Sequence, residues 1–411
     1  MGLFDKLKKM AKDTLDSAAT AAFGPSSQET EKPTEQAPQE PEVKAPIEYT
    51  VTVDFELNQV ADGEYEIVKF VGFEEESMEI PAEINGQRIV GIADEVFFQL
   101  GAITNIKIAD GIRYIGKNAF AECADLVNVE LPETLERIGD YCFSKTPLEE
   151  IKLPASVVEV GVGAFMECEE LLTAVLPENL EVVPANMFTG CKNLNDITFP
   201  KNLSVVGHYA FHGTALILES LPDTITTIDD GGFCGCFQDE DGYHDAVEEF
   251  RLPSGLKTIG AKGLAGLNCL KLIVPASVTF IGENAFEYLG CVDGEVDVIF
   301  EEGCSAVLSN GIFFNGSLDT DSTISSITIP PQITEIGNIF YGKDNKLATY
   351  DVKDEYGRQV YDERGNRMYE HEWVEKTYNA PPENLTIYCD PGSAAMKFAR
   401  ENGINCAKRE V

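Results

Sequence analysis

Apolar and polar positions recur along most of the chain with a nearly constant spacing. Each repeat contains one large apolar position, which is phenylalanine in all repeats but one: Phe97, Phe120, Phe143, Phe165, Phe188, Phe211, Phe233, Leu264, Phe286 and Phe313. The steps between them are 23, 23, 22, 23, 23, 22, 31, 22 and 27 residues, and an aliphatic residue lies five positions before each. A period of roughly 20–29 residues predicts a solenoid, in which each coil buries its apolar side only against neighbouring coils.

Within one repeat, the pattern predicts a short strand, a corner and a buried aromatic segment. In the unit from residue 148 to 168 the inward residues of the strand are Leu148, Ile151 and Leu153. Pro154 ends the strand because proline lacks the N–H that a ladder needs. Phe165 then begins an expected short helical or 3-10 segment, with Cys168 on the same face. The predicted fold class is an α/β repeat solenoid of leucine-rich-repeat type, a right-handed coil with a parallel β-sheet on one face and helical or 3-10 segments opposite.

Glycine usually follows the aliphatic residue of each repeat: Gly116, Gly139, Gly161, Gly207, Gly260, Gly282 and Gly337. Pro184 occupies the same place in another repeat. Proline holds φ at about −65°, so this position does not require a left-handed backbone. We interpret the glycine as giving room at a tight corner.

Four segments differ in composition. Residues 1–23 predict an amphipathic helix whose docking face is Leu3, Phe4, Leu7, Met10 and Leu15. Residues 24–46 are rich in Pro, Glu and Gln and predict a disordered tether. The solenoid is expected over 47–389, with an opening unit at 47–97 and an insertion at 341–383, followed by a C-terminal helical cap at 390–411.

The consensus of the repeats, LPxxVxxIGxxAFxxCxxLxxIxLP, resembles the BspA-like leucine-rich repeat family from about Ile80 to Pro330. The segments VADGEYEIVKFVGF and LTIYCDPGSAAMKFARENGINC resemble that family's opening unit and its closing strand and helix. This resemblance implies a solenoid used for adhesion or protein binding, often at cell surfaces. We expect no cofactor.

Charge and cysteine content narrow the classes of partner and location. The net charge is −39, from 70 acidic and 31 basic residues. Nucleic acid is therefore excluded as a partner, since its phosphates bind Lys and Arg. Residues 1–23 lack the continuous apolar stretch of an export signal, and no longer stretch predicts a membrane span. Eleven cysteines are then interpreted as reduced thiols in a cytoplasmic protein, with a cell-surface location by another route as the alternative.

Three groups of residues are candidates for chemical sites. Cysteines three residues after the ladder phenylalanine form a series, Cys123, Cys168, Cys191 and Cys236, interpreted as small core residues rather than metal ligands. His208 and His212 have a zinc-like spacing but flank a ladder phenylalanine, and the acidic stretch 239–245 lacks the spacing of a calcium loop. We therefore expect no catalytic, cofactor-binding or metal-binding residues.

Two surfaces remain as candidate binding sites. The outward columns of the sheet contain neither Tyr nor Trp, the residues that favour binding hot spots together with Arg. The insertion contains the one Trp, and its segment 354–369 predicts a protruding hairpin with a turn at 364–366. The candidate contacts of the insertion are Tyr350, Tyr356, Arg358, Tyr361, Arg364, Arg367, Tyr369 and Trp373. The predicted function is a non-enzymatic protein-interaction scaffold. The alternatives are a surface adhesin and a scaffold held at a membrane surface through residues 1–23; partner and oligomeric state stay open.

Overall fold

The computed structural model describes residues 50–51, 55–72, 76–236, 246–290, 295–314, 323–351, 369–378, 381–382 and 384–409. The chain divides into two compact units, Met1–Ile47 and Glu48–Val411. The predicted helix at 1–23, with its docking face, and the predicted tether at 24–46 lie outside the described residues. All of the described residues belong to the second unit.

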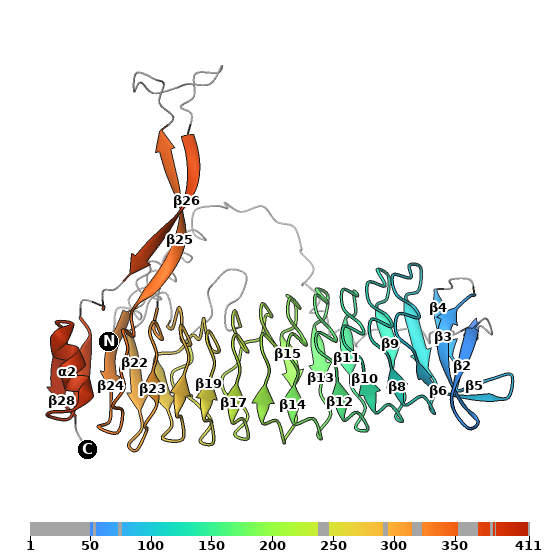
Figure 1. Ribbon diagram of the computed structural model, residues 1–411, viewed down its shortest axis with the longest axis horizontal. Helices are drawn as coiled ribbons and strands as arrows, with labels where there is room; N and C mark the ends of the chain where they lie inside the picture. The colour runs from blue at the N-terminus through green and yellow to red at the C-terminus, as the bar shows by residue number, and fades with distance from the viewer. Residues whose placement is uncertain are drawn as a thin grey trace, which may run out of the picture. The chain divides into compact units, whose positions relative to one another are not determined.

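The second unit is a parallel β-solenoid of about 12 turns, whose coils stack side by side (Figure 1). Each regular coil contributes one strand to each of two parallel ladders, not to the single sheet that the sequence predicted. The first ladder contains β1 (Thr50–Val51), β4 (Ser77–Ile80), β7 (Asn105–Ile108), β9 (Asn128–Glu130), β11 (Glu150–Lys152), β13 (Thr173–Val175), β15 (Asp196–Thr198), β18 (Phe250–Arg251), β20 (Lys271–Val274), β22 (Glu295–Phe300), β24 (Thr323–Thr328), β27 (Thr386–Cys389) and β28 (Asn405–Lys408).

The second ladder begins at the opening unit and carries the aliphatic residue of each repeat. Its strands are β3 (Glu64–Phe70), β6 (Gln87–Ile92), β8 (Tyr114–Ile115), β10 (Arg137–Ile138), β12 (Glu159–Val160), β14 (Val182–Val183), β16 (Val205–Val206), β17 (Thr227–Ile228), β19 (Thr258–Ile259), β21 (Phe280–Ile281) and β23 (Val307–Leu308). In the opening unit, β2 (Phe55–Ala61) pairs antiparallel with β3, and β5 (Glu83–Ile84) pairs antiparallel with β6.

The segment that carries the ladder phenylalanine is a turn, so the predicted helical or 3-10 segments were wrong. Its backbone is left-handed at two positions four residues apart, such as Asn118 with φ of 51° and Glu122 with φ of 59°. A right-handed helix requires negative φ throughout. Alternate N–H groups of the turn bond to the next coil: Asn118 N donates to Asp140 O at 2.9 Å, and Phe120 N donates to Cys142 O at 2.9 Å.

The phenylalanines form a stacked column through the core. Ring centroids lie 4.9 Å apart between Phe97 and Phe120, and 5.6 Å apart between Phe143 and Phe165, with nearly parallel planes. All four side chains are fully buried. This separation is close to the strand spacing of roughly 4.8 Å, because each ring is supplied by one coil of the stack.

The corner glycines have the role that the sequence predicted. A Cβ atom at Gly139 would lie 2.5 Å from the carbonyl carbon of Gly116, and one at Gly161 would lie 2.3 Å from the nitrogen of Asp140. Neither glycine has a positive φ. The glycine therefore permits the backbones of neighbouring coils to approach closely.

The solenoid ends in a helix followed by a final strand. Ser393 caps α2 (Ala394–Glu401), since its Oγ accepts from the Met396 N–H at 3.2 Å. The side chain of Arg409 forms ion pairs with Glu302 and Asp390, which fasten this end to an earlier coil. Within the described part of the chain, α2 is the only α-helix.

The insertion contains a hairpin of two ten-residue strands, β25 (Gly342–Asp351) and β26 (Tyr369–Tyr378). They pair antiparallel along their full length, from Gly342 opposite Tyr378 to Asp351 opposite Tyr369. A hairpin was predicted over residues 354–369, which lie outside the described residues except for Tyr369, so it stays a prediction; the two observed strands flank that segment.

Candidate binding surfaces

The outward residues of the first ladder lie in the two columns that the sequence predicted. The pairing places Asn105 beside Asn128, Thr173 beside Asp196, and Lys271 beside Asp297. An amide ladder begins the first column, because Asn128 donates to Asn105 at 2.8 Å. The register therefore confirms that consecutive repeats align residue by residue.

Charges on the first-ladder face are compensated by neighbours around β18 and β20. Lys271 Nζ lies 2.9 Å from Glu249 Oε2, and Arg251 forms ion pairs with both Glu249 and Glu301. The hydrogen bond from Lys271 lowers the pKa of the Glu249 carboxyl. This part of the face therefore presents paired charges to solvent.

The first ladder is interrupted between β15 and β18, where the coil at 216–221 forms no strand. A hollow of about 570 Å³ lies at this break, lined by Phe199, Ser220, Leu221, Pro222, Asp223, Arg251, Leu252 and Ser254. It contains one carboxylate and one guanidinium but no histidine or cysteine, so the residues that line it do not form a nucleophile–base pair.

The outward column of the second ladder changes character along the solenoid. Over β8, β10 and β12 it consists of Tyr114, Arg137 and Glu159. Over the six-stranded sheet that comes next, every outward position in the column is uncharged: Val182, Val205, Thr227, Thr258, Phe280 and Val307. We call these six residues the uncharged column.

The uncharged column is well exposed. Val182 and Phe280 each keep 45% of their surface accessible, and Val307 keeps 37%. The three remaining members are half-buried between their neighbours. Isolated exposed apolar residues are normal on proteins, but registered apolar and β-branched residues on six adjacent strands form a continuous stripe.

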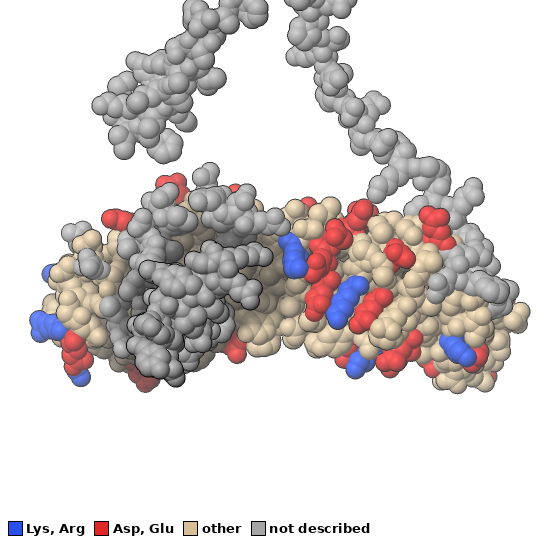
Figure 2. All heavy atoms as spheres, turned by 90° about the horizontal axis from the view of Figure 1, so that it is seen from above, with Lys and Arg blue, Asp and Glu red and all other residues tan. Residues whose placement is uncertain are grey.

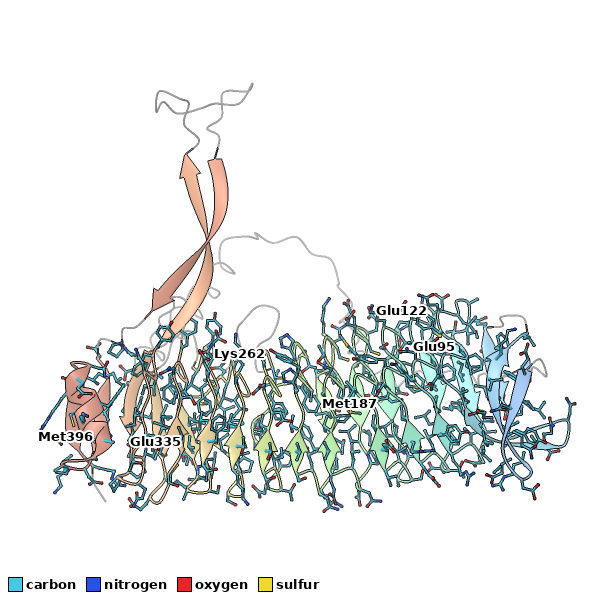
Figure 3. All side chains as sticks on the ribbon, viewed as in Figure 1. Glu95, Glu122, Met187, Lys262, Glu335 and Met396 are labelled. Atoms are coloured by element: carbon cyan, nitrogen blue, oxygen red, sulfur yellow. The ribbon has the colours of Figure 1, made fainter. Side chains whose placement is uncertain are left out.

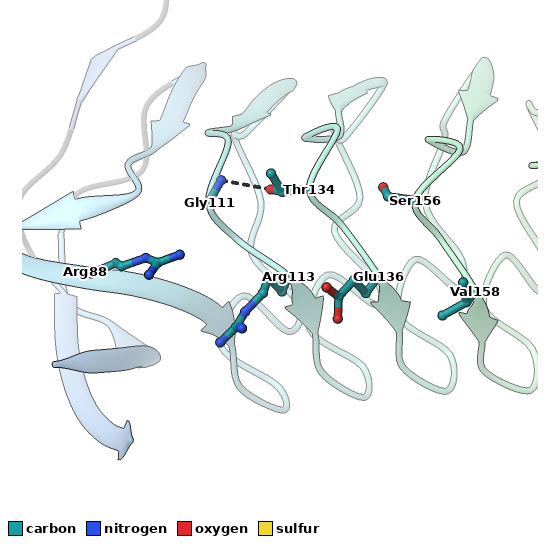
Figure 4. Close-up of a pocket in the computed structure, with 7 residues that line it drawn as sticks. All are labelled: Arg88, Gly111, Arg113, Thr134, Glu136, Ser156 and Val158. Carbon is teal, nitrogen blue, oxygen red and sulfur yellow. Dashed lines mark hydrogen bonds between the residues drawn. The ribbon is translucent and has the colours of Figure 1, made fainter. Parts of the chain in front are cut away.

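A shallow groove lies over the earlier, charged coils of the second ladder (Figure 4). It encloses about 440 Å³, and its lining residues are Arg88, Gly111, Arg113, Thr134, Glu136, Ser156 and Val158. Its hydroxyl groups are engaged in coil-to-coil bonds: Thr134 accepts from Gly111 N at 2.8 Å, and Ser156 donates to Leu135 O at 2.6 Å. Glu64 forms ion pairs with both Arg88 and Arg113, so the positive charge of the groove is also compensated.

The turns that carry the ladder phenylalanines form an acidic edge. Figure 2 views the molecule from this side and shows Asp and Glu side chains outnumbering Lys and Arg over the N-terminal coils. Glu95 and Glu122 lie on this edge (Figure 3). Glu122 accepts from Gln99 at 2.7 Å and lies 3.6 Å from the Lys145 ammonium.

The cysteine series is structural, as predicted. Each thiol lies in the core and donates to the carbonyl of a phenylalanine in the preceding coil: Cys123 to Phe97 at 3.0 Å, and Cys168 to Phe143 at 3.1 Å. Thr146 occupies the same column and donates to the same carbonyl, at 2.8 Å. Burial raises the pKa of Cys236 to about 12, which keeps that thiol protonated at neutral pH.

The histidine pair lies on a turn rather than on a helix. Both rings are exposed and pack against Tyr209, with centroids 4.3 Å away for His208 and 5.2 Å away for His212. Nδ1 of His212 forms a hydrogen bond with the Cys234 carbonyl. Among the described residues, no group of three or more His, Cys, Asp or Glu side chains is arranged to hold a metal ion.

The predicted contact residues of the insertion are only partly within the described chain. Tyr350 lies in β25, and Tyr369 and Trp373 lie in β26, where Trp373 pairs with Leu347 across the hairpin. The other five, Tyr356, Arg358, Tyr361, Arg364 and Arg367, lie outside the described residues. Their role as partner contacts stays a prediction.

In the described segments, no helix has the length and apolar character needed to cross a bilayer.

Several solved structures match this chain in part. Solved structures with similar folds include a leucine rich cell surface protein from Faecalibacterium prausnitzii, 24% identical, which covers 71% of this chain and 90% of its own with a TM-score of 0.45. A T. pallidum leucine rich repeat protein is 25% identical over 47% of this chain and 92% of its own, with a TM-score of 0.35. The pneumococcal vaccine antigen PcpA is 16% identical over 87% and 97%, with a TM-score of 0.45.

Among curated proteins, none matches the chain. The BspA type Leucine rich repeat region matches it in six copies, over residues 90–218, 173–292 and 206–348. These ranges cover more than half of the sequence and coincide with the regular coils of the solenoid. The chain belongs to the BspA type leucine-rich repeat family.

Proposed function

We propose that this chain is a non-enzymatic scaffold that binds a protein partner through the uncharged column of the second ladder. The supporting observation is that six adjacent strands present no charge in this column, in a protein with 25% charged residues and a net charge of −39. Interface cores are depleted of charged residues and enriched in aromatic ones.

The backbone beneath the column favours binding because it is already ordered. The outward side chains stand beside fully buried partners such as Val183, Val206 and Ile281. Val and Thr have few rotamers to lose, so a partner that covers them causes a small loss of conformational entropy. Glu181 and Lys257, which precede two of these strands and are exposed, would lie at the polar rim of such an interface.

A photo-reactive residue tests which face binds. Benzoylphenylalanine would replace Phe280 in one full-length protein and Tyr388, on the first ladder, in another. These aromatic side chains are comparably exposed, at 45% and 38%. We expect a specific partner to cross-link at position 280 in lysate of the source cells. Cross-linking only at 388, or equally at both positions, would contradict the proposal.

The insertion is a second candidate, because its ten-pair hairpin gives an extended structure outside the repeat pattern. Pull-down with the full chain and with a variant lacking residues 341–373 distinguishes the two surfaces. Binding through the uncharged column predicts that the shortened chain recovers the same partner. Loss of that partner would assign the contact to the insertion.

The cytoplasmic location is part of this proposal. Fractionation of source cells tests it, with the protein expected in the cytosolic fraction. Recovery on intact cells by surface labelling would favour the adhesin alternative.

A further inference from the structure

The final strand of the solenoid is hydrogen-bonded to a single neighbouring strand. Strand β28 pairs with β27 and, among the described strands, with no other. Three of its four residues are exposed, whereas β27 buries Ile387 and Cys389. A strand with one neighbour and little burial opens more readily than strands inside the stack.

Two cysteines meet at this junction. Cys389 ends β27 and is fully buried, and Cys406 lies on β28 and is exposed. Their sulfur atoms are 3.0 Å apart, about 1 Å longer than a disulfide bond. In the register, Ile387 pairs with Cys406 and Cys389 pairs with Lys408, so both cysteines occupy the inward side of the sheet.

The core cysteines provide the contrast. Cys168 and Cys191 are fully buried and donate to phenylalanine carbonyls, so dissolved oxidants do not reach them. Cys406 combines exposure with a thiol neighbour in direct contact.

We propose that Cys389 and Cys406 are a redox-active pair that a small disulfide compound oxidises to an intramolecular disulfide joining β27 to β28. In the first step the Cys406 thiolate attacks one sulfur of the oxidant, and one thiolate leaves. Cys389, as its thiolate, then attacks the Cys406 sulfur and expels the second thiolate. The two cysteine protons end on the two released thiols, and the oxidant receives the two electrons that the cysteine sulfurs lose.

The surroundings of the two cysteines determine which thiol reacts with the oxidant first. Burial, followed by the Cys406 thiol, raises the pKa of Cys389 to about 12. Exposed Cys406 is therefore the thiol that meets the oxidant first. Once Cys406 is in the mixed disulfide, its contribution to the raised pKa of Cys389 is removed, and Cys389 can act as the resolving thiol.

The disulfide would close a loop that contains α2. Because the two cysteines are 17 positions apart, α2 would be enclosed between them. Cross-linking a loop of this length disfavours the open state by a factor of about 100. Oxidation would thus fasten the end of the solenoid.

The experiment uses the full chain and glutathione disulfide as the oxidant. After oxidation, free thiols are alkylated, and mass spectrometry of the digest identifies linked peptides; hydrogen exchange follows the amides of α2. We expect a Cys389–Cys406 link that dithiothreitol removes, together with exchange in α2 slowed by about 100-fold.

Three variants control this measurement. Cys406→Ser and Cys406→Ala should give no link and no change in exchange, and Cys234→Ser, which removes a half-buried thiol in another coil, should behave as the unmodified chain does. Glutathione that stays on Cys406, a link from Cys406 to any other cysteine or to a second chain, or a link that leaves exchange in α2 unchanged would overturn the proposal.

Discussion

The two ladders are made by the same coils, yet they present different outward faces. In one coil, Val175 points outward from the first ladder and Val182 from the second. The strand before Val175 places the charged Lys152 beside it, whereas the column that contains Val182 is uncharged over six strands. Stacking constrains only the inward residues, so each outward face is free to acquire its own chemistry.

Both faces depend on the phenylalanine column, and its loss is the largest expected effect. Phe165→Ala removes a fully buried ring that stacks on Phe143 and Phe188. We expect the free energy of unfolding to fall by about 3–5 kcal/mol, measured by urea denaturation. Val175→Ala, at an exposed site, is the control and should change it little. A loss below about 1 kcal/mol for Phe165→Ala would contradict the stacking of these rings in the core.

Substitution of a corner glycine should have the next largest effect on stability, because these glycines set the distance between coils for both ladders. In Gly161→Ala the new Cβ would lie 2.3 Å from the Asp140 nitrogen. We expect a loss of roughly 1–3 kcal/mol in the same denaturation experiment. Gly101→Ala is the matched control, since the nearest atom to its Cβ is 3.9 Å away. Equal stability of the two variants would show that the coils separate without cost.

The smallest effect concerns the compensated charges of the first ladder. The hydrogen bond from Lys271 holds the Glu249 pKa below its ordinary value of 4.5. Such a depressed pKa stabilises the fold above the unfolded-state pKa, and this contribution is lost as the pH falls through the folded-state pKa.

In Lys271→Ala the Glu249 pKa should therefore rise, as followed by NMR titration of its side-chain carboxyl. The difference in stability from the unmodified chain should be present near neutral pH and vanish in acid. Lys152→Ala, on the same face, should leave the Glu249 pKa where it is. An unchanged pKa in Lys271→Ala would show that this ion pair does not form in solution.

Much of the fold could be predicted from the period alone. The stacked phenylalanines, the aligned columns, the corner glycines and the core role of Cys168 all follow from the rule that each coil repeats its neighbour. The predicted helical segments failed because apolar spacing does not report φ. A signal was present: Asn or Gly recurs two positions before the ladder phenylalanine, at 118, 163, 186, 231, 284 and 311, and these residues tolerate a left-handed backbone.

Other features depend on contacts that a repeat does not contain. Arg409 reaches Glu302 across 107 positions, and the coil at 216–221 forms no strand of the first ladder. The uncharged column could not be predicted for a different reason. The sequence pattern predicted one sheet strand in each coil, so the residue before each aliphatic position was not expected to belong to an outward face.

The most direct test compares Val182→Lys with Val175→Lys in the full chain. Both are exposed valines of one coil, at 45% and 37% accessible surface, so the two variants differ chiefly in the face that gains a charge. The measurement is the affinity, by titration calorimetry, for the protein that cross-links at position 280. We predict at least about a tenfold loss, or 1.4 kcal/mol, for Val182→Lys and little change for Val175→Lys. Equal losses, or a greater loss for Val175→Lys, would contradict binding through the uncharged column.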